Sequence, residues 1–98
     1  MTGYDFNRPF VDQADMATFK ARDRATANQF GPLVKAYELS NSEYGQRYQR
    51  LHGPNNMNQP PSHGRIFSGY VVVRKLGTPS QYETWMPDHV FDELYEPA

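Results

Sequence analysis

The side chains that most often catalyse reactions or bind metals are few in this chain and poorly spaced for either task. Cysteine is absent, which removes disulfides, thiolate nucleophiles and thiolate metal ligands together. The three histidines, His52, His63 and His89, do not fall at the i, i+4 spacing that places two imidazoles on one helix face. A zinc site would need all three and a carboxylate, so neither a metal nor a cofactor is expected.

Acid–base and nucleophilic catalysis have equally little support. Asp88, His89 and Ser80 could be combined into a triad, but no glycine-flanked serine elbow is present. The adjacent carboxylates Asp92 and Glu93 fall on a solvated helix face, where acid or base catalysis lacks the burial it needs. No glycine-rich phosphate loop is found either. We therefore expect a protein that is not an enzyme.

Composition indicates one globular domain without a strong electrostatic preference for a partner. The chain has 98 residues, of which 38% are hydrophobic and 14% aromatic, and a formal net charge of −1. That is enough apolar material for one modest core, whereas the charge is too small to attract nucleic acid or an anionic membrane. No apolar run approaches the ~20 residues of a membrane-spanning helix. A cytoplasmic protein with no membrane partner is the expectation.

The clearest structural signal is a β-hairpin within residues 65–98. Tyr and Val side chains at residues 70–73 favour a strand, and both of its alternating faces are apolar. Such a strand should lie inside a sheet or under a helix. Residues 81–86 provide an antiparallel partner, reached through an open turn at residues 76–80 that contains Gly and Pro.

A short helix should follow the hairpin. Pro87 lacks an amide hydrogen and therefore ends the second strand, and Asp88 is placed to cap the first helical turn. The helix has one apolar stripe, which makes it a lid on the hairpin: Val90, Phe91, Leu94 and Tyr95. Pro97 is expected to stop it.

The end of the chain resembles the C-terminal ending of many small proteins encoded by bacteriophages. Those endings contain a Gly-Asp-Trp-Ile-Ile strand, a short turn, then Pro-Asp-x-Phe and Tyr-Glu-Pro. In this chain Gly69 matches the glycine and Tyr70 stands in the aromatic neighbourhood; the rest is matched by Pro87, Asp88, Phe91, Tyr95, Glu96 and Pro97. The similarity covers roughly the last third of the chain, with a longer turn and a different N-terminal half. The resemblance implies a phage origin and no particular activity, because those proteins mostly have none assigned.

The first half of the chain is expected to be helical. Residues 12–30 begin with Asp12 as a helix cap, contain several alanines and end at a Gly-Pro pair. The proline of that pair then opens a helix of about two turns over residues 33–39. Lys20, Arg22 and Arg24 on the first helix are interpreted as part of a solvated, mixed-charge surface rather than a nucleic-acid face.

A third helix should begin at a capping box formed by Ser40 and Glu43 and run to Leu51. It brings Tyr and Arg side chains together, and protein interfaces favour both types in binding hot spots. Alternatively, the tyrosines are half-buried core residues with arginines extending above them to solvent. The Pro- and Asn-rich loop at residues 53–64 could order on a partner. The expected partner-binding residues are Tyr44, Arg47, Tyr48, Arg50, Asn56 and Met57.

These signals predict an α+β domain in which two or three N-terminal helices pack on a small antiparallel sheet, closed by a short C-terminal helix. The sheet is the hairpin at residues 66–86. The single domain, residues 1–98, is divided into an aromatic arm (1–11), a helical half (12–52), the loop (53–64) and the hairpin plus helix (65–98). The arm either packs on the domain as an edge strand or reaches out to a partner.

The function expected from this organisation is that of a small bacteriophage accessory protein in the host cytoplasm. It would bind a host bacterial protein without catalysis, as an anti-defence inhibitor or a modulator of a host enzyme. One alternative is a minor virion or assembly protein, which self-association would favour. Another is a nucleic-acid-associated regulator, for which Arg22, Arg24, Arg47 and Arg50 supply positive charge. Acidic neighbours dilute that charge, so nucleic acid is not the expected partner.

Overall fold

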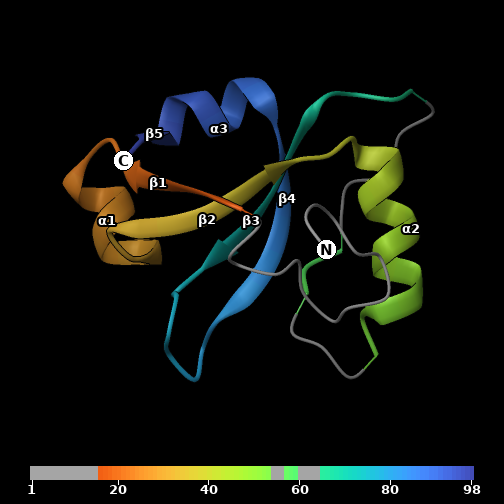
Figure 1. The fold of residues 1–98 in the computed structure, drawn as a ribbon, viewed down its shortest axis with the longest axis horizontal. Coiled ribbons are helices and arrows are strands. Elements are labelled where there is room, and N and C mark those ends of the chain that lie inside the picture. Colours follow the sequence, from red (N-terminus) through yellow and green to blue (C-terminus); the bar gives the residue numbers. More distant parts are fainter. Residues whose placement is uncertain (1–15, 54–56, 60–64) are drawn as a thin grey trace.

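The chain folds around a five-stranded antiparallel sheet that carries helices on both faces (Figure 1). The computed structural model describes residues 16–53, 57–59 and 65–98. The elements, in chain order, are β1 (Ala17–Ala21), α1 (Arg24–Phe30), β2 (Leu33–Glu38), α2 (Asn41–Leu51), β3 (Gly69–Arg74), β4 (Tyr82–Pro87), α3 (Asp88–Leu94) and β5 (Tyr95–Pro97). The strands lie side by side in the order β4-β3-β2-β1-β5.

The predicted hairpin is confirmed as β3 and β4. The two strands pair in an antiparallel register that places Val71 opposite Trp85 and Val73 opposite Glu83. Val71, Val72 and Val73 are fully buried, as expected for a strand with two apolar faces. β3 lies between β2 and β4 in the sheet, and its side chains are covered on both faces.

The two faces of the sheet hold two separate clusters of buried side chains. The cluster under α2, called here the α2 core, contains Met16, Leu39, Tyr44, Val71, Val73 and Trp85. The cluster under α3, called the α3 core, contains Val34, Ala36, Val72, Met86, Phe91 and Tyr95. Because neighbouring residues of a strand point to opposite faces, β3 contributes valines to both clusters.

Two of the three predicted N-terminal helices, at residues 12–30 and 33–39, are wrong. The expected helix at residues 12–30 is replaced, within the described residues, by strand β1 and the seven-residue helix α1. Asp23 marks the break, because its Oδ1 accepts a hydrogen bond from the Thr26 backbone N–H at 2.7 Å and caps α1 there. This hydrogen bond also lowers the pKa of Asp23 below its ordinary value. Pairing with β2 and β5 on either side outweighs the helix propensity of the alanines.

The expected helix at residues 33–39 is also wrong, since this segment forms β2. Val34 and Ala36 point into the α3 core, while Tyr37 packs against the α2 core, which is the alternation of a strand. The fold is therefore α+β with strands leading the chain and one N-terminal helix, rather than two or three helices on a hairpin.

Helix α2 begins as predicted. Ser40 Oγ accepts a hydrogen bond from the Glu43 N–H at 3.1 Å, and Glu43 Oε1 accepts one from the Ser40 N–H at 3.0 Å. This reciprocal pair is the capping box inferred from the Ser-x-x-Glu spacing. The helix then runs to Leu51, the residue at which it was expected to end.

Helix α3 is present, but both of its ends differ from expectation. Pro87 occupies the N-cap position and no side chain caps the helix, so the predicted cap at Asp88 is wrong. Asp88 lies in the first turn, where a carboxylate interacts favourably with the helix dipole. Tyr95 does not continue the helix. It begins β5, which pairs with β1 through Ala21 and gives the sheet its fifth strand.

Candidate functional site

A surface groove lies where the chain enters β3 and leaves β4. Its volume is about 440 Å³, and its walls combine apolar and polar side chains: Ile66, Phe67, Ser68, Trp85, Pro87, Asp88 and His89. Two of these are large apolar residues with unusual exposure, Ile66 at 74% and Phe67 at 41%. A groove with adjacent exposed apolar side chains is the kind of surface at which proteins bind partners.

The exposed residues are held by a buried asparagine. The Asn41 side chain donates a hydrogen bond from Nδ2 to the Arg65 carbonyl at 3.0 Å and accepts one at Oδ1 from the Phe67 N–H at 2.7 Å. The Asn41 backbone N–H donates to the Phe67 carbonyl at 3.1 Å. The backbone on either side of Ile66 is thereby tied to the first residue of α2. Ile66 thus projects into solvent from an anchored segment, so little conformational entropy would be lost when it contacts a partner.

The floor of the groove is the indole of Trp85, which crosses over Gly69. An added Cβ at Gly69 would lie 2.3 Å from Cζ2 of Trp85, so only glycine leaves room for the ring. The indole Nε1 donates a hydrogen bond to the Leu39 carbonyl at 2.7 Å. Trp85 thereby joins β4 to the end of β2 across β3, and it fixes the position of the groove relative to the sheet.

The remaining wall is polar. Asp88 and His89 lie at the start of α3, with Asp88 Oδ1 3.8 Å from His89 Nδ1, and both side chains are exposed. Ser68 is linked to this wall through its carbonyl, which accepts a hydrogen bond from the Asp88 N–H at 3.1 Å. The groove therefore presents a carboxylate beside an apolar floor.

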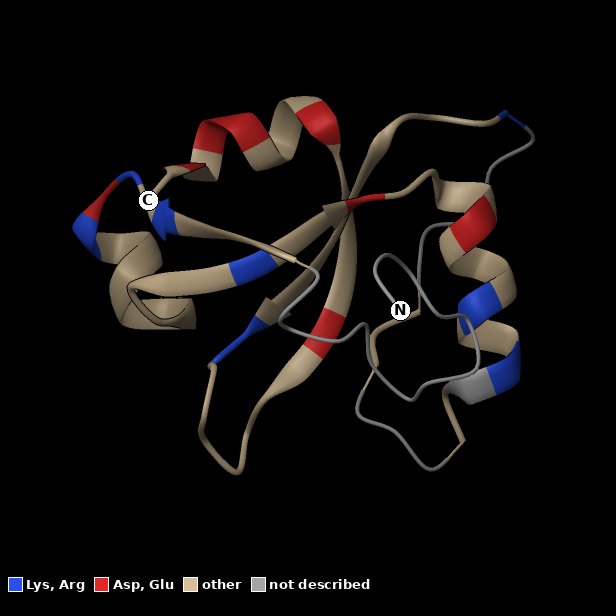
Figure 2. Cartoon of the chain, viewed as in Figure 1, with Lys and Arg blue, Asp and Glu red and all other residues tan. Residues whose placement is uncertain are grey.

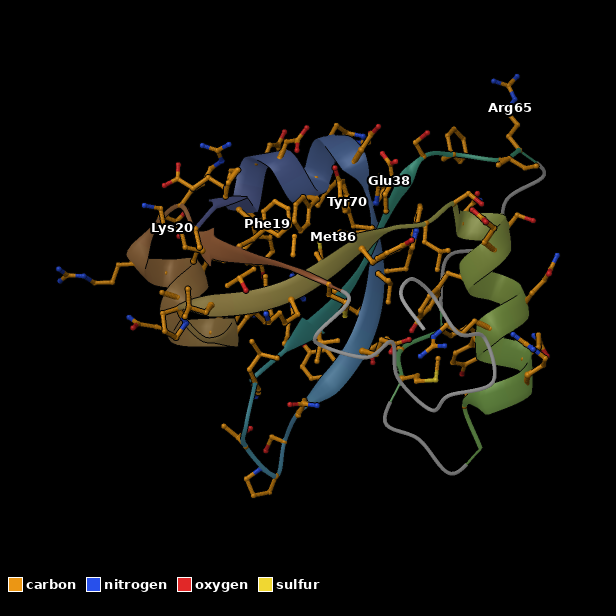
Figure 3. All side chains as sticks on the ribbon, viewed as in Figure 1. Phe19, Lys20, Glu38, Arg65, Tyr70 and Met86 are labelled. Carbon is orange, nitrogen blue, oxygen red and sulfur yellow. The ribbon has the colours of Figure 1, made fainter. Side chains whose placement is uncertain are left out.

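Carboxylates gather beyond Asp88, on the α3 side of the sheet. Burial raises the pKa of the Tyr70 phenol above its ordinary value, and the negative charges of Glu38, Asp92 and Asp88 raise it further. Figure 3 shows Glu38 beside Tyr70, and Figure 2 shows acidic residues in α3 and at the end of β2. One end of the groove therefore faces a region of negative potential.

The structure separates the predicted partner-binding residues. Tyr44 is fully buried in the α2 core. Tyr48 is half-buried, with its ring stacked on His52 at a centroid distance of 4.3 Å, and Arg50 is exposed on α2. Met57 is half-buried against the α2 core, and Asn56 lies outside the described residues. These side chains do not form one exposed Tyr/Arg surface.

Arg47 is the clearest case of a predicted partner-binding residue that lies inside the protein. Its Nε lies 2.7 Å from Oε1 of Glu83 and its Nη2 lies 3.1 Å from Oε2, and both side chains are 0% exposed. This two-pronged ion pair joins α2 to β4 inside the α2 core. Arg47 therefore stabilises the packing of α2, and the alternative in which the arginines extend to solvent is wrong for this residue.

Sequence reasoning missed the groove, although one signal was present. Ile66 and Phe67 form an apolar pair directly after the polar loop and before the buried strand, outside the valine run that defines the sheet interior. Nothing local shows that this pair is exposed, because the exposure depends on Asn41, which lies 24 residues before Arg65 and 26 before Phe67.

A second hollow lies at the other end of the molecule, between α1 and the turn that joins β3 to β4. It has a volume of about 560 Å³ and lining residues that include Gly31, Leu33, Lys75 and Thr78. Leu33 is 46% exposed there. The backbone at Leu33 is held by pairing with β1, as that at Ile66 is held by Asn41. The first groove is the better candidate because two adjacent large apolar side chains, Ile66 and Phe67, are exposed there, against Leu33 alone among the described residues that line the second hollow.

The described part of the chain contains no group of three or more His, Asp or Glu residues arranged to hold a metal ion. No helix within it has the length and apolar character required to cross a membrane. No protein-family model matches the chain, and no match was found among curated proteins or solved structures.

Proposed function

We propose that this chain is a small bacteriophage accessory protein that acts by binding a host bacterial protein in the host cytoplasm, without catalysis. The observation that carries the binding role is the exposure of Ile66 on a segment fixed by Asn41. An exposed large apolar side chain gains free energy when a partner covers it, and the anchored backbone reduces the entropy lost in binding. The groove floored by Trp85 supplies the recess beside it.

The phage part of the proposal depends on the resemblance of residues 69–97 to the endings of small phage proteins. Four of the matched residues have structural roles: Gly69 accommodates the Trp85 ring, Phe91 and Tyr95 lie in the α3 core, and Glu96 binds Lys20 and Arg22. These residues support a shared C-terminal architecture, whereas the exposed apolar side chains proposed to contact the partner, Ile66 and Phe67, lie outside the pattern.

Steric occlusion is the proposed mechanism. A bound domain of this size covers the surface of a defence protein or host enzyme around the contact and needs no reactive group to block it. A standard interface buries about 800 Å² on each partner, which requires residues beyond the groove. Exposed Arg50 on α2 remains a candidate for that wider contact.

The test is affinity capture from a nuclease-treated bacterial lysate, followed by mass spectrometry. The bait is compared with the double variant Ile66→Ser/Phe67→Ser and with the matched control Leu33→Ser, which removes an exposed apolar side chain far from the groove. We expect one host protein in near-equal amount with the wild-type and control baits, and its loss with the double variant. Equal recovery by all three baits would contradict the groove as the binding site.

Self-association would support the alternative of a virion or assembly protein. Sedimentation of the purified chain over a range of concentrations distinguishes it from host-protein binding. A stable oligomer that the double variant disrupts, together with no captured host protein, would replace the proposed function with assembly.

A further inference from the structure

We infer that the groove binds an extended segment of the partner in which one large apolar side chain is flanked by lysine or arginine. This inference depends on the proposed function, because it specifies the chemistry of the partner at the same site. The apolar side chain would enter the recess between Phe67, Trp85 and Pro87, while the basic side chains would face Asp88 and the carboxylates beyond it.

The backbone at the edge of the sheet favours recognition through side chains over the addition of a strand. The Glu83 carbonyl accepts a hydrogen bond from the Asn58 N–H at 2.9 Å, so Glu83 turns its backbone groups away from β3. In an antiparallel ladder, the backbone groups of residues two and four positions further along point in the same direction as those of Glu83. The backbone groups of Trp85 and Pro87 therefore also face away from β3, at the edge of the sheet. Pro87 has no N–H to donate there, and a proline at an edge opposes strand addition.

The floor of the groove suits an apolar side chain. Trp85 is buried and its indole N–H is already bonded to the Leu39 carbonyl, so the ring offers carbon surface and no spare donor. Phe67 and Ile66 extend that surface outward at the rim. A large aliphatic or aromatic side chain in the groove would remove the apolar area of these residues from water, and the free energy gained by that burial favours such a residue in the partner.

The charge around the groove selects the neighbours of that residue. Asp88 lines the groove, and the negative charges of Glu38 and Asp92 act together with it on the Tyr70 phenol. Lys20 and Arg22 bind Glu96, and Arg22 Nε donates a hydrogen bond to the Asp92 carbonyl at 2.6 Å, so these two basic side chains lie at the far end of α3 from Asp88. A basic side chain of the partner would therefore meet the Asp88 carboxylate at the groove, which favours association and disfavours acidic segments.

Arg65 is the basic residue in the sequence next to the groove. Its backbone carbonyl is held by Asn41, and Figure 3 shows its side chain directed outward from the end of the molecule. It does not line the groove. Arg65 therefore leaves the carboxylates on the opposite wall available to a basic partner.

The chain carries its own reporter of occupancy. Trp85 is the single tryptophan, so emission excited at wavelengths that tyrosine does not absorb comes from the floor of the groove. The experiment titrates the full-length chain with three synthetic peptides that lack Trp and Tyr. The first has a central Leu flanked by Lys and Arg; the second replaces the basic residues with Glu; the third replaces Leu with Ala. We expect a saturable change in Trp85 emission with the first peptide, binding at least about tenfold weaker with the other two, and weaker binding at higher salt.

Variants identify the carboxylates. The double variant Glu38→Gln/Asp92→Asn should weaken binding of the basic peptide by roughly threefold to tenfold. Glu93→Gln is the matched control, since it removes a charge from the same helix without touching the three carboxylates that act on Tyr70. Equal effects of the double variant and the control would overturn the inference. Equal binding of the basic and acidic peptides would overturn it as well.

The same variants separate this inference from the proposed function. If the host protein is captured less well after Ile66→Ser/Phe67→Ser but equally well after Glu38→Gln/Asp92→Asn, the groove binds a partner that is not basic, and only the inference fails. If Ile66→Ser/Phe67→Ser leaves capture unchanged, the proposed function of the groove fails. A concentration-dependent shift in Trp85 emission without peptide would identify a second copy of this chain as the occupant and would also overturn the inference.

Discussion

The two faces of the sheet are stabilised by different kinds of contact. In the α3 core the rings pack on one another: the centroid of Phe91 lies 4.2 Å from that of Tyr70 in a stacked pair and 4.8 Å from that of Phe19 in an edge contact. The α3 core has one side-chain hydrogen bond to Tyr95, from Arg74, whereas the α2 core contains a buried ion pair between Arg47 and Glu83 and a hydrogen bond from the Trp85 indole to the Leu39 carbonyl.

The difference separates folding from function. Ring packing gains much of its free energy from burial, and more than one ring geometry is favourable, as the stacked Tyr70 and edge-on Phe19 contacts of Phe91 show. Directional bonds between residues far apart in the sequence fix α2, β2 and β4 at one relative position. The groove lies at the end of the α2 core, on Trp85 and next to Asn41, so its geometry depends on the face of the sheet that is less tolerant of change.

The largest effect should come from breaking the buried ion pair. Glu83→Gln removes the carboxylate charge that faces Arg47 Nε and Nη2 inside the core and should lower the free energy of unfolding by about 3 to 5 kcal/mol. Replacing both residues by methionine should recover most of that loss, because an apolar pair needs no desolvation of charge. Urea denaturation of the single and double variants measures both values.

The exposed ion pair between Arg22 and Glu96 is the control for that experiment. Its members are partly exposed, and Glu96→Gln should cost no more than about 1 kcal/mol. Equal costs for Glu83→Gln and Glu96→Gln would show that the pair in the α2 core is not desolvated, and the contrast between the two faces would lose its main support.

A smaller but still large effect is expected at Gly69. In Gly69→Ala the new Cβ would lie 2.3 Å from Trp85 Cζ2 and 2.4 Å from the Met86 carbonyl oxygen, so the indole must move. Overpacking of this kind costs about 1 to 3 kcal/mol. Thermal unfolding measures the loss, and the emission of Trp85 reports the displacement. A variant with unchanged stability and emission would mean that the ring does not lie on Gly69.

The sequence predicts the hairpin and α2 better than β1 and β2 because the signals for the hairpin and α2 are local. The valines of β3 are apolar on both faces, and the Ser40 and Glu43 capping box needs only four consecutive residues. By contrast, β1 and β2 are alanine-containing segments that become strands through pairing along the sheet, with Ala17 opposite Ala36. Propensity is a weak guide where such tertiary pairing decides the outcome.

The candidate site could not be predicted for the same reason. Arg47 is assigned to the surface by its charge, and its partner Glu83 lies 36 residues away. Trp85 reaches a carbonyl 46 residues away. Local patterns identify the elements that carry these residues, whereas burial and exposure depend on which elements meet.

The α3 core should be sensitive to alkaline pH. Burial raises the pKa of Tyr95 above its ordinary value of 10.0, and the charge of nearby Arg74 opposes that rise. A raised pKa in the folded state means that the neutral phenol is favoured by folding, so this stabilisation is present below about pH 10 and is lost as pH rises through the folded pKa. Urea denaturation at several alkaline pH values should show falling stability, and Tyr95→Phe should flatten that fall.

Tyr95→Phe has a separate effect at neutral pH. Arg74 Nε donates a hydrogen bond to the Tyr95 hydroxyl at 3.0 Å, and its removal should cost about 1 kcal/mol. Tyr70→Phe is the comparison, since burial and three carboxylates raise the pKa of Tyr70 in the same direction. A pH profile that neither substitution changes would show that other groups cause the alkaline loss.

The smallest effect on stability should occur at the groove itself. Ile66 is 74% exposed, so Ile66→Ser removes little buried area and should change the free energy of unfolding by less than about 0.5 kcal/mol. The matched substitution in the anchor, Asn41→Ala, breaks two side-chain hydrogen bonds and should cost about 1 to 3 kcal/mol. Chemical denaturation compares the two variants. A large loss with Ile66→Ser would show that Ile66 stabilises the fold, and its exposure would no longer argue for binding. A small loss of stability in Ile66→Ser and a large loss in Asn41→Ala would mean that a buried polar residue holds in place an apolar side chain that the fold does not need. That combination is expected of a binding surface.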